Sequence, residues 1–200
     1  MAVRTRNQVI AFRVTPAEAK KLREKVRQSG LSQQEYLLRA ALDRPLWEAV
    51  LLDDLRDRGV EREASWTRMA GLWEAMRASV AGYDPDKRSA CGLTGGAAAK
   101  VEAAGVELSG AFVTQVMATA LKVAECNSCM GRIVAAPTAG ASGVLPAVLL
   151  PVQAKYALSD EEILRALYVS AGFGQVIATR ASIAGAEGGC QAEVGSASAM

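Results

Sequence analysis

The 200-residue sequence contains no histidine, and only 5% of its residues are aromatic. Without histidine the chain cannot form a Ser-His-Asp triad, a Cys-His pair or a histidine-ligated zinc site. A long apolar run is also missing, because the longest one, Val144 to Val152, contains two prolines and is far shorter than the roughly 18 residues that span a bilayer. The N-terminus has no apolar segment of the signal-peptide kind. The sequence therefore predicts a cytoplasmic protein with no membrane partner.

Cysteine is scarce as well, with four residues in the chain. Cys126 and Cys129 have the C-x-x-C spacing found at zinc and iron–sulfur sites, but their apolar surroundings favour buried, inert thiols. Cys91 receives the same interpretation. Cys190 follows two glycines and is flanked by acidic residues, a pattern typical of a thiolate metal ligand in a tight loop.

Charge and glycine are distributed unevenly along the chain. Residues 1–45 contain ten Lys or Arg and four acidic residues, a net charge of +6, whereas residues 46–200 carry −4. Of the 18 glycines, 14 occur from Gly92 onward. This contrast predicts two modules, 1–45 and 46–200, with a boundary at Asp43–Pro45.

The first module has the pattern of a strand followed by two helices. Val9–Thr15 alternates between apolar and other residues, as a half-buried strand does. Thr15 with Glu18, and Ser32 with Glu35, have the spacing of capping boxes that begin two helices. Gly30 is expected to end the first of these helices in the left-handed conformation.

This module resembles the ribbon-helix-helix accessory proteins of plasmid mobilisation. The resemblance implies a homodimer formed through residues 1–45, whose paired strands enter the major groove of duplex DNA. It also implies that Arg13 faces bases and that Arg4 and Arg6 contact phosphates. The alternative is a basic, solvated helical hairpin that has no role in DNA binding.

The second module has helical periodicity throughout. Apolar residues spaced by three and four positions predict helices between Leu46 and Gly82, and a further helix over Ser109–Glu125. Ser159 is expected to cap another helix, which Gly172 and Gly174 would interrupt. No pattern in this module favours a sheet.

A loop of small residues, 137–143, precedes an apolar helix. Its backbone amides and the hydroxyls of Thr138 and Ser142 suit a carboxylate or phosphate. Small residues also permit close helix packing, and this alternative is equally consistent with the pattern.

Three segments of the second module, "GLTGG", "MGRIVAAPTAGASGVLPAVLL" and "ASIAGAEGGCQAEVGSASAM", resemble the alpha chain of iron–sulfur-dependent L-serine dehydratase, also called L-serine ammonia-lyase. The resemblance implies a largely helical fold and a [4Fe–4S] cluster on three cysteines, whose open iron acts as a Lewis acid in the conversion of L-serine to pyruvate and ammonia. By this resemblance Cys190 is a cluster ligand, and Thr138, Ala139, Gly140 and Ser142 hold the substrate carboxylate.

In that family the other two cluster cysteines follow the "CQAEVG" motif, and this sequence does not contain them. The expectation is a mainly α chain with a strand-helix-helix module before an incomplete all-α lyase domain, arising as a natural fusion, a fragment or an artificial chimera. The chain alone is expected to assemble no [4Fe–4S] cluster and to be inactive. The resemblance implies L-serine as the substrate of an active form and a serine dehydratase beta chain as a protein partner. The alternatives are a DNA-binding protein and a non-catalytic, protein-binding chimera.

Overall fold

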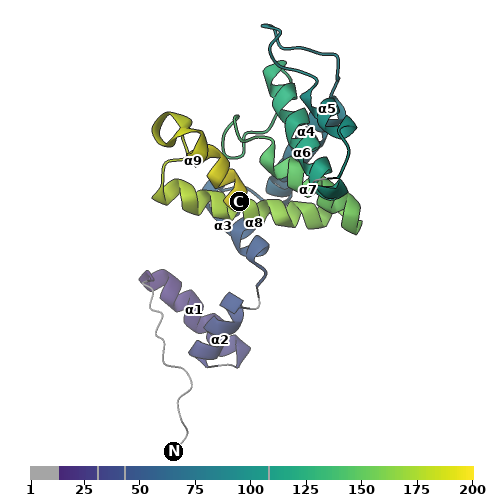
Figure 1. Ribbon diagram of the computed structural model, residues 1–200. Coiled ribbons are helices and arrows are strands. Elements are labelled where there is room, and N and C mark those ends of the chain that lie inside the picture. Colours follow the sequence, from purple (N-terminus) through teal and green to yellow (C-terminus); the bar gives the residue numbers. More distant parts are fainter. Residues whose placement is uncertain (1–13, 31, 43, 108) are drawn as a thin grey trace, which may run out of the picture. The chain divides into compact units, whose positions relative to one another are not determined.

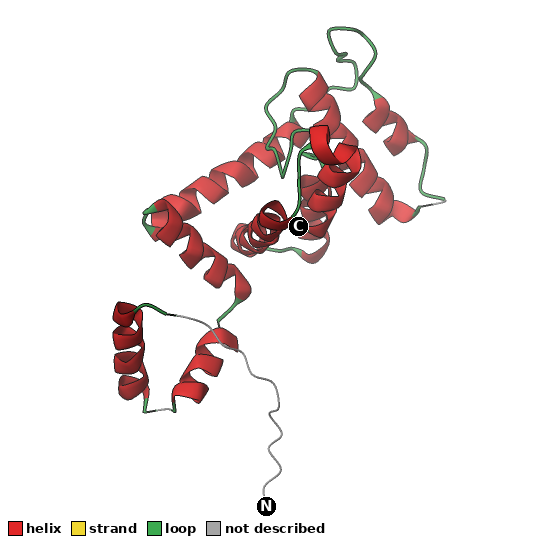
Figure 2. Ribbon diagram, turned by 90° about the vertical axis from the view of Figure 1, so that its left-hand side faces the viewer, coloured by secondary structure: helices red, strands yellow, loops and turns green. Residues whose placement is uncertain are grey.

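The computed structural model describes residues 14–200 apart from positions 31, 43 and 108. All regular structure in this described part is helical, and no strand occurs in it (Figure 2). The mainly α prediction is therefore confirmed. The helices are α1 (Pro16–Ser29), α2 (Gln33–Leu42), α3 (Leu46–Arg58), α4 (Arg62–Ala81), α5 (Ala97–Ala103), α6 (Gly110–Ser128), α7 (Val144–Tyr156), α8 (Asp160–Arg180) and α9 (Gly185–Ala199).

The predicted strand-helix-helix module is not supported. Arg4, Arg6, Arg13 and most of the strand predicted over Val9–Thr15 lie outside the described residues. The two described residues of that segment belong to no strand, because Thr15 is already the cap of a helix. The two predicted helices, in contrast, are present as α1 and α2.

Compact packing divides the chain into two units, Met1–Pro45 and Leu46–Met200. In the first unit, α1 begins with the predicted capping box. The Glu18 amide donates to Oγ1 of Thr15 at 3.3 Å, and the Glu18 carboxylate accepts from the Thr15 amide at 2.8 Å. Gly30 ends the helix at φ 68°, and α1 buries none of its residues.

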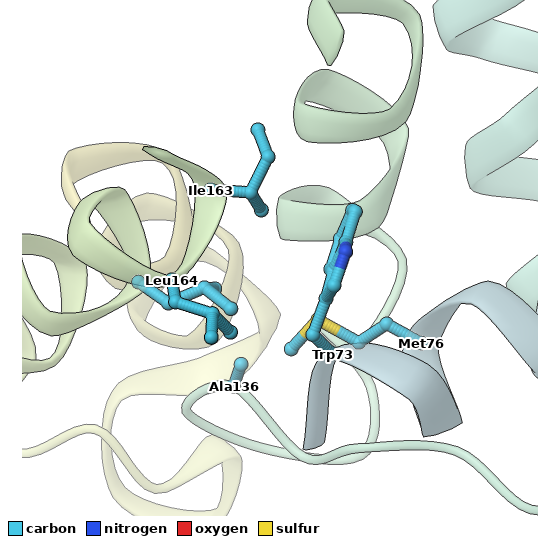
Figure 3. Packing of buried hydrophobic residues seen from close by; sticks show 6 residues of the cluster. Trp73, Met76, Ala136, Ile163 and Leu164 are labelled. Atoms are coloured by element: carbon cyan, nitrogen blue, oxygen red, sulfur yellow. The ribbon is translucent and has the colours of Figure 1, made fainter. Parts of the chain in front are cut away.

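In the second unit, α8 packs along α3, and α6 packs against α4, α5 and α7 (Figure 1). α9 contacts both α7 and α8. The central apolar cluster lies where α4 and α8 meet the loop before α7. Trp73 and Met76 reach it from α4, Ile163 and Leu164 from α8, and Ala136 from the loop (Figure 3). Each large apolar side chain buried in this way contributes roughly 1.5–3 kcal/mol.

The predicted interruption of α8 at its glycines is wrong. α8 continues through Gly172 and Gly174 to Arg180. A Cβ atom at Gly172 would lie 2.6 Å from Cγ2 of Val50, and one at Gly174 would lie 2.8 Å from Cε of Met200. The two glycines therefore permit close contact with α3 and with the last residue of the chain, and they do not break the helix.

Within the described residues, no helix combines the length and the apolar character needed to cross a bilayer.

Candidate functional site

The predicted anion-binding loop lies between α6 and α7 and contacts α6 at two points. Asn127 at the end of α6 donates from Nδ2 to the carbonyl of Ala139 at 3.5 Å. At the other end, a Cβ atom on Gly143 would lie 2.9 Å from the carbonyl oxygen of Ala120, so α6 and the start of α7 touch through the backbone. The peptide bond between Ala136 and Pro137 is cis.

The four predicted ligand-binding residues differ in exposure. Ala139 and Gly140 are exposed, and among the described residues their amides donate no hydrogen bond. Thr138 is partly buried, and its Oγ1 is fully enclosed without a hydrogen-bond partner in the described part of the chain. Ser142 is buried, with its amide 3.3 Å from the Ala139 carbonyl. The accessible edge of the loop is therefore Ala139–Gly140.

Cys190 is not in the tight loop predicted for it. The segment Gly185–Ala199 forms α9, and the helix is broken at Gly189, which has φ 70° and ψ 178°. Cys190 is the first residue after this break and is exposed. The helix resumes at Cys190 and continues to Ala199.

The loop and α9 meet at Glu193, one helical turn after Cys190. A Cβ atom on Gly140 would lie 3.1 Å from Oε2 of Glu193. One on Gly185 would lie 2.9 Å from Cδ of the same side chain. The Glu193 carboxylate thus occupies a slot between two glycines and lies against the accessible edge of the loop. Sequence analysis identified Glu193 only as an acidic neighbour of Cys190.

The other three cysteines lie in two different settings. Cys91 is exposed, so its interpretation as a buried thiol is wrong. Its Sγ is 3.4 Å from Oγ of Ser89, and hydrogen bonding to Ser89 lowers the pKa of the thiol. Cys126 and Cys129 are partly buried at the end of α6, and burial raises the pKa of Cys126.

A [4Fe–4S] cluster with one open iron needs three thiolates directed at one point. In the described part of the chain, no three His, Cys, Asp or Glu side chains are arranged to hold a metal ion. The four cysteines of the described residues therefore do not form by themselves the three-thiolate site that such a cluster needs.

Glu125 is a buried polar residue that sequence analysis did not identify. Its carboxylate accepts hydrogen bonds from the amides of Gly96 at 2.9 Å, Ala97 at 2.6 Å and Ala98 at 3.3 Å. It thereby caps the start of α5 from another helix. The available signal was Gly96 at the capping position directly before Ala97, because a glycine has no side chain to accept from the first amides of α5.

A second buried network joins α3, α4 and α8. Ser65 donates to Oδ2 of Asp54 at 2.5 Å, and its hydroxyl is 2.8 Å from that of Tyr168. Burial raises the pKa of Tyr168, and Trp66 stacks on its ring at 5.7 Å. A cavity of about 390 Å³ borders this network. It is formed by α3, α4 and α8, none of which carries the predicted ligand-binding residues.

Comparisons with curated proteins point to serine dehydratases. The chain is 47% identical over 115 residues to the probable L-serine dehydratase alpha chain of Bacillus subtilis, a match that covers 56% of this chain and 38% of that protein. It is 51% identical over 96 residues to the L-serine dehydratase alpha chain of Peptoniphilus asaccharolyticus, covering 48% and 33%. An L-serine dehydratase of Mycobacterium bovis is 46% identical over 90 residues, covering 40% of this chain and 18% of the relative.

The matches thus span only about a third of the length of the first two relatives. No solved structure matches the chain significantly. The family model for the serine dehydratase alpha chain matches residues 6–200. This match includes nearly all of the N-terminal unit, so the interpretation of residues 1–45 as a ribbon-helix-helix segment foreign to the family finds no support. The chain belongs to the serine dehydratase alpha chain family.

Proposed function

We propose that this chain provides the substrate-binding part of an L-serine ammonia-lyase, which converts L-serine to pyruvate and ammonia. The loop formed by Thr138, Ala139, Gly140 and Ser142 holds the substrate carboxylate. The observation that carries the proposal is the pair of exposed amides of Ala139 and Gly140, which donate no hydrogen bond among the described residues.

The amides of Ala139 and Gly140 suit a carboxylate because they are exposed donors on a loop that is hydrogen-bonded to Asn127 of α6. Thr138 and Ser142 support the loop on its buried side, because the Thr138 hydroxyl is enclosed and the Ser142 side chain is buried. A loop held in place before the ligand arrives loses little conformational freedom on binding, which favours affinity.

The test is a titration of the full chain with L-serine, in which the backbone amide resonances of the folded protein are monitored. The largest shifts are expected at Ala139 and Gly140, and no change is expected at Gly105, an exposed glycine beyond the end of α5. Shifts spread evenly over the chain, or none at all with the protein folded, would contradict the assignment of the loop.

Cys190 is proposed as a cluster ligand, and the other thiolates are proposed to be cysteines that are not among the 200 residues of this sequence. Cys91, Cys126 and Cys129 belong to other motifs, and the described residues bring no three donors together. The chain alone is therefore expected not to dehydrate serine, because binding without stabilisation of the transition state gives no rate.

This expectation is tested by anaerobic reconstitution of the full chain with iron and sulfide, followed by a pyruvate assay with L-serine. Neither a cluster absorbance band nor pyruvate is expected. If both are observed and Cys190→Ala abolishes both, the four thiols of this sequence do converge in solution, and the proposal that the cluster needs further cysteines is wrong.

A serine dehydratase beta chain is the proposed protein partner. Apolar side chains on α7 and α8, including Val148, Phe173 and Val176, are about half exposed. A largely apolar cavity of about 510 Å³ lies between α7, α8 and α9. Exposed apolar surface of this kind is typical of an interaction site. Co-purification with a beta chain that Val148→Asp abolishes would support this partner, and co-purification that is insensitive to the substitution would exclude the surface.

A second proposal concerns α1, which exposes a cluster of cations. Five basic residues are solvent-exposed along this helix: Lys20, Lys21, Arg23, Lys25 and Arg27. Such a surface can bind duplex DNA through its phosphates, with each contact steepening the salt dependence by about 0.9 in log–log slope. The affinity for duplex DNA is expected to fall with added salt. Lys21→Glu is expected to weaken binding, and Lys155→Glu is expected to leave it unchanged. Binding unchanged by salt would exclude this proposal.

A further inference from the structure

Glu193 is a partly buried carboxylate that lies against the accessible edge of the loop. Two glycines, Gly140 and Gly185, create the space that it fills, since a Cβ atom on either would lie 3.1 Å or less from an atom of the carboxylate. The motif that carries Cys190 and the loop motif, separated by about 50 residues in sequence, therefore meet at this one acidic group.

The carboxylate has no partner in the part of the chain that the structure describes. No hydrogen bond or ion pair there involves the Glu193 side chain, and no Lys or Arg lies within ion-pairing distance of it. A carboxylate partly removed from water loses solvation that only a cation or hydrogen-bond donors can replace. The Glu193 oxygens are not among the enclosed atoms of the described residues, so a positively charged group on the loop can approach them and is attracted by their charge.

The charge of Glu193 also limits how a ligand can sit on the loop. A carboxylate held by the amides of Ala139 and Gly140 is repelled by a second carboxylate nearby unless a positive charge lies between them. An α-amino acid supplies this charge, because its ammonium and carboxylate groups are attached to the same carbon atom. A hydroxy acid of the same shape does not.

We propose that Glu193 binds the α-ammonium group of the substrate and thereby selects an amino acid over the corresponding hydroxy acid. This inference rests on the proposed function, in which the loop binds the substrate carboxylate. Glu193 is assigned to the ammonium end of the ligand, and the amides of Ala139 and Gly140 to the carboxylate end. The enclosed hydroxyl of Thr138, which has no hydrogen-bond partner among the described residues, lies in the same loop.

The test compares three ligands in amide-resonance titrations of the full chain. L-serine carries both groups, L-glycerate has a hydroxyl in place of the ammonium, and serinol has no carboxylate. Each is titrated against the unmodified chain, Glu193→Gln and Glu187→Gln. Glu187 is the matched control, because it is an exposed acid on the same helix and no contact joins it to the loop in the described part of the chain.

The unmodified chain and Glu187→Gln are expected to bind L-serine about ten- to a hundredfold more tightly than L-glycerate, as a charge-assisted hydrogen bond does. In Glu193→Gln this ratio is expected to fall to near one, with serinol binding weakly throughout. Gly185→Ala is the second variant, because its methyl group displaces the carboxylate without removing it. Gly185→Ala is expected to lower the ratio as well, and it tests the inference even if Glu193→Gln does not fold.

The outcomes separate the inference from the function on which it rests. A preference for L-serine over L-glycerate that persists unchanged in Glu193→Gln overturns the role of Glu193. The proposed function still stands in that case if L-serine and L-glycerate both shift the amides of Ala139 and Gly140. Failure of the folded chain to bind either L-serine or L-glycerate overturns the assignment of the loop, and the inference with it.

Discussion

α1 and α8 begin with the same local structure but differ in what they bury. In α1 the Thr15 amide donates to the Glu18 carboxylate at 2.8 Å, and in α8 the Ser159 amide donates to the Glu162 carboxylate at 2.8 Å. The reciprocal bond from the glutamate amide to the hydroxyl is 3.3 Å in both. Yet α1 buries no residue, whereas α8 buries five. Four residues therefore decide where a helix starts, and its neighbours decide how much stability it gains.

The largest expected difference between the two helices comes from the same substitution in each. Leu167→Ala in α8 removes a side chain from the central cluster, where it is 4% exposed, and is expected to lower the free energy of unfolding by about 2–5 kcal/mol. Leu22→Ala in α1 removes a partly buried side chain from a helix with no buried residue and is expected to cost less than about 1 kcal/mol. Urea unfolding of both variants measures the contrast, and equal losses would show that α1 is also part of a packed core.

A helix capped from a distance provides the next test. Glu125→Ala leaves the first amides of α5 without their acceptor and is expected to lower the free energy of unfolding by about 1.5–3 kcal/mol. The control, Glu107→Ala, removes an exposed acid and is expected to change stability by less than about 0.5 kcal/mol. If the two variants are equally stable in urea, water can replace Glu125 as the cap.

Sequence reasoning succeeded where neighbouring residues determine the structure. The capping residues Thr15 and Ser159, and the left-handed Gly30, were predicted because each acts within one helical turn. Helical spacing of apolar residues also predicted the all-helical body correctly.

It failed where the deciding contact comes from a distant segment. Gly172 and Gly174 looked like helix breakers because the sequence does not show that Val50 and Met200 approach them. The roles of Glu125 and Glu193 were not predicted because their surroundings, the start of α5 and the loop before α7, are assembled only by folding.

The capping boxes themselves are expected to give a smaller effect. Ser159→Ala removes the two hydrogen bonds of the Ser159 hydroxyl, one accepted from the Glu162 amide and one donated to the Glu162 carboxylate, and is expected to cost about 1 kcal/mol in urea unfolding. Thr15→Ala removes the two equivalent bonds from α1, and amide hydrogen exchange of α1 should become faster. A cost for Ser159→Ala close to zero would mean that packing alone holds the first turn of α8.

The smallest expected effect is the dependence of stability on pH at the start of α8. Hydrogen bonds from the Ser159 amide, and then from its hydroxyl, lower the pKa of Glu162 below 4.5. Because the folded pKa is the lower one, the stabilisation is complete above the unfolded value and is lost as pH falls through the folded pKa. Ser159→Ala removes the hydroxyl but keeps the amide, which is the larger of the two causes. The variant should therefore lose less stability between neutral pH and pH 3 than the unmodified chain does, while Glu162→Gln should lose less still. Urea unfolding at both pH values measures these differences, and three identical slopes would show that the Glu162 carboxylate contributes nothing to the cap.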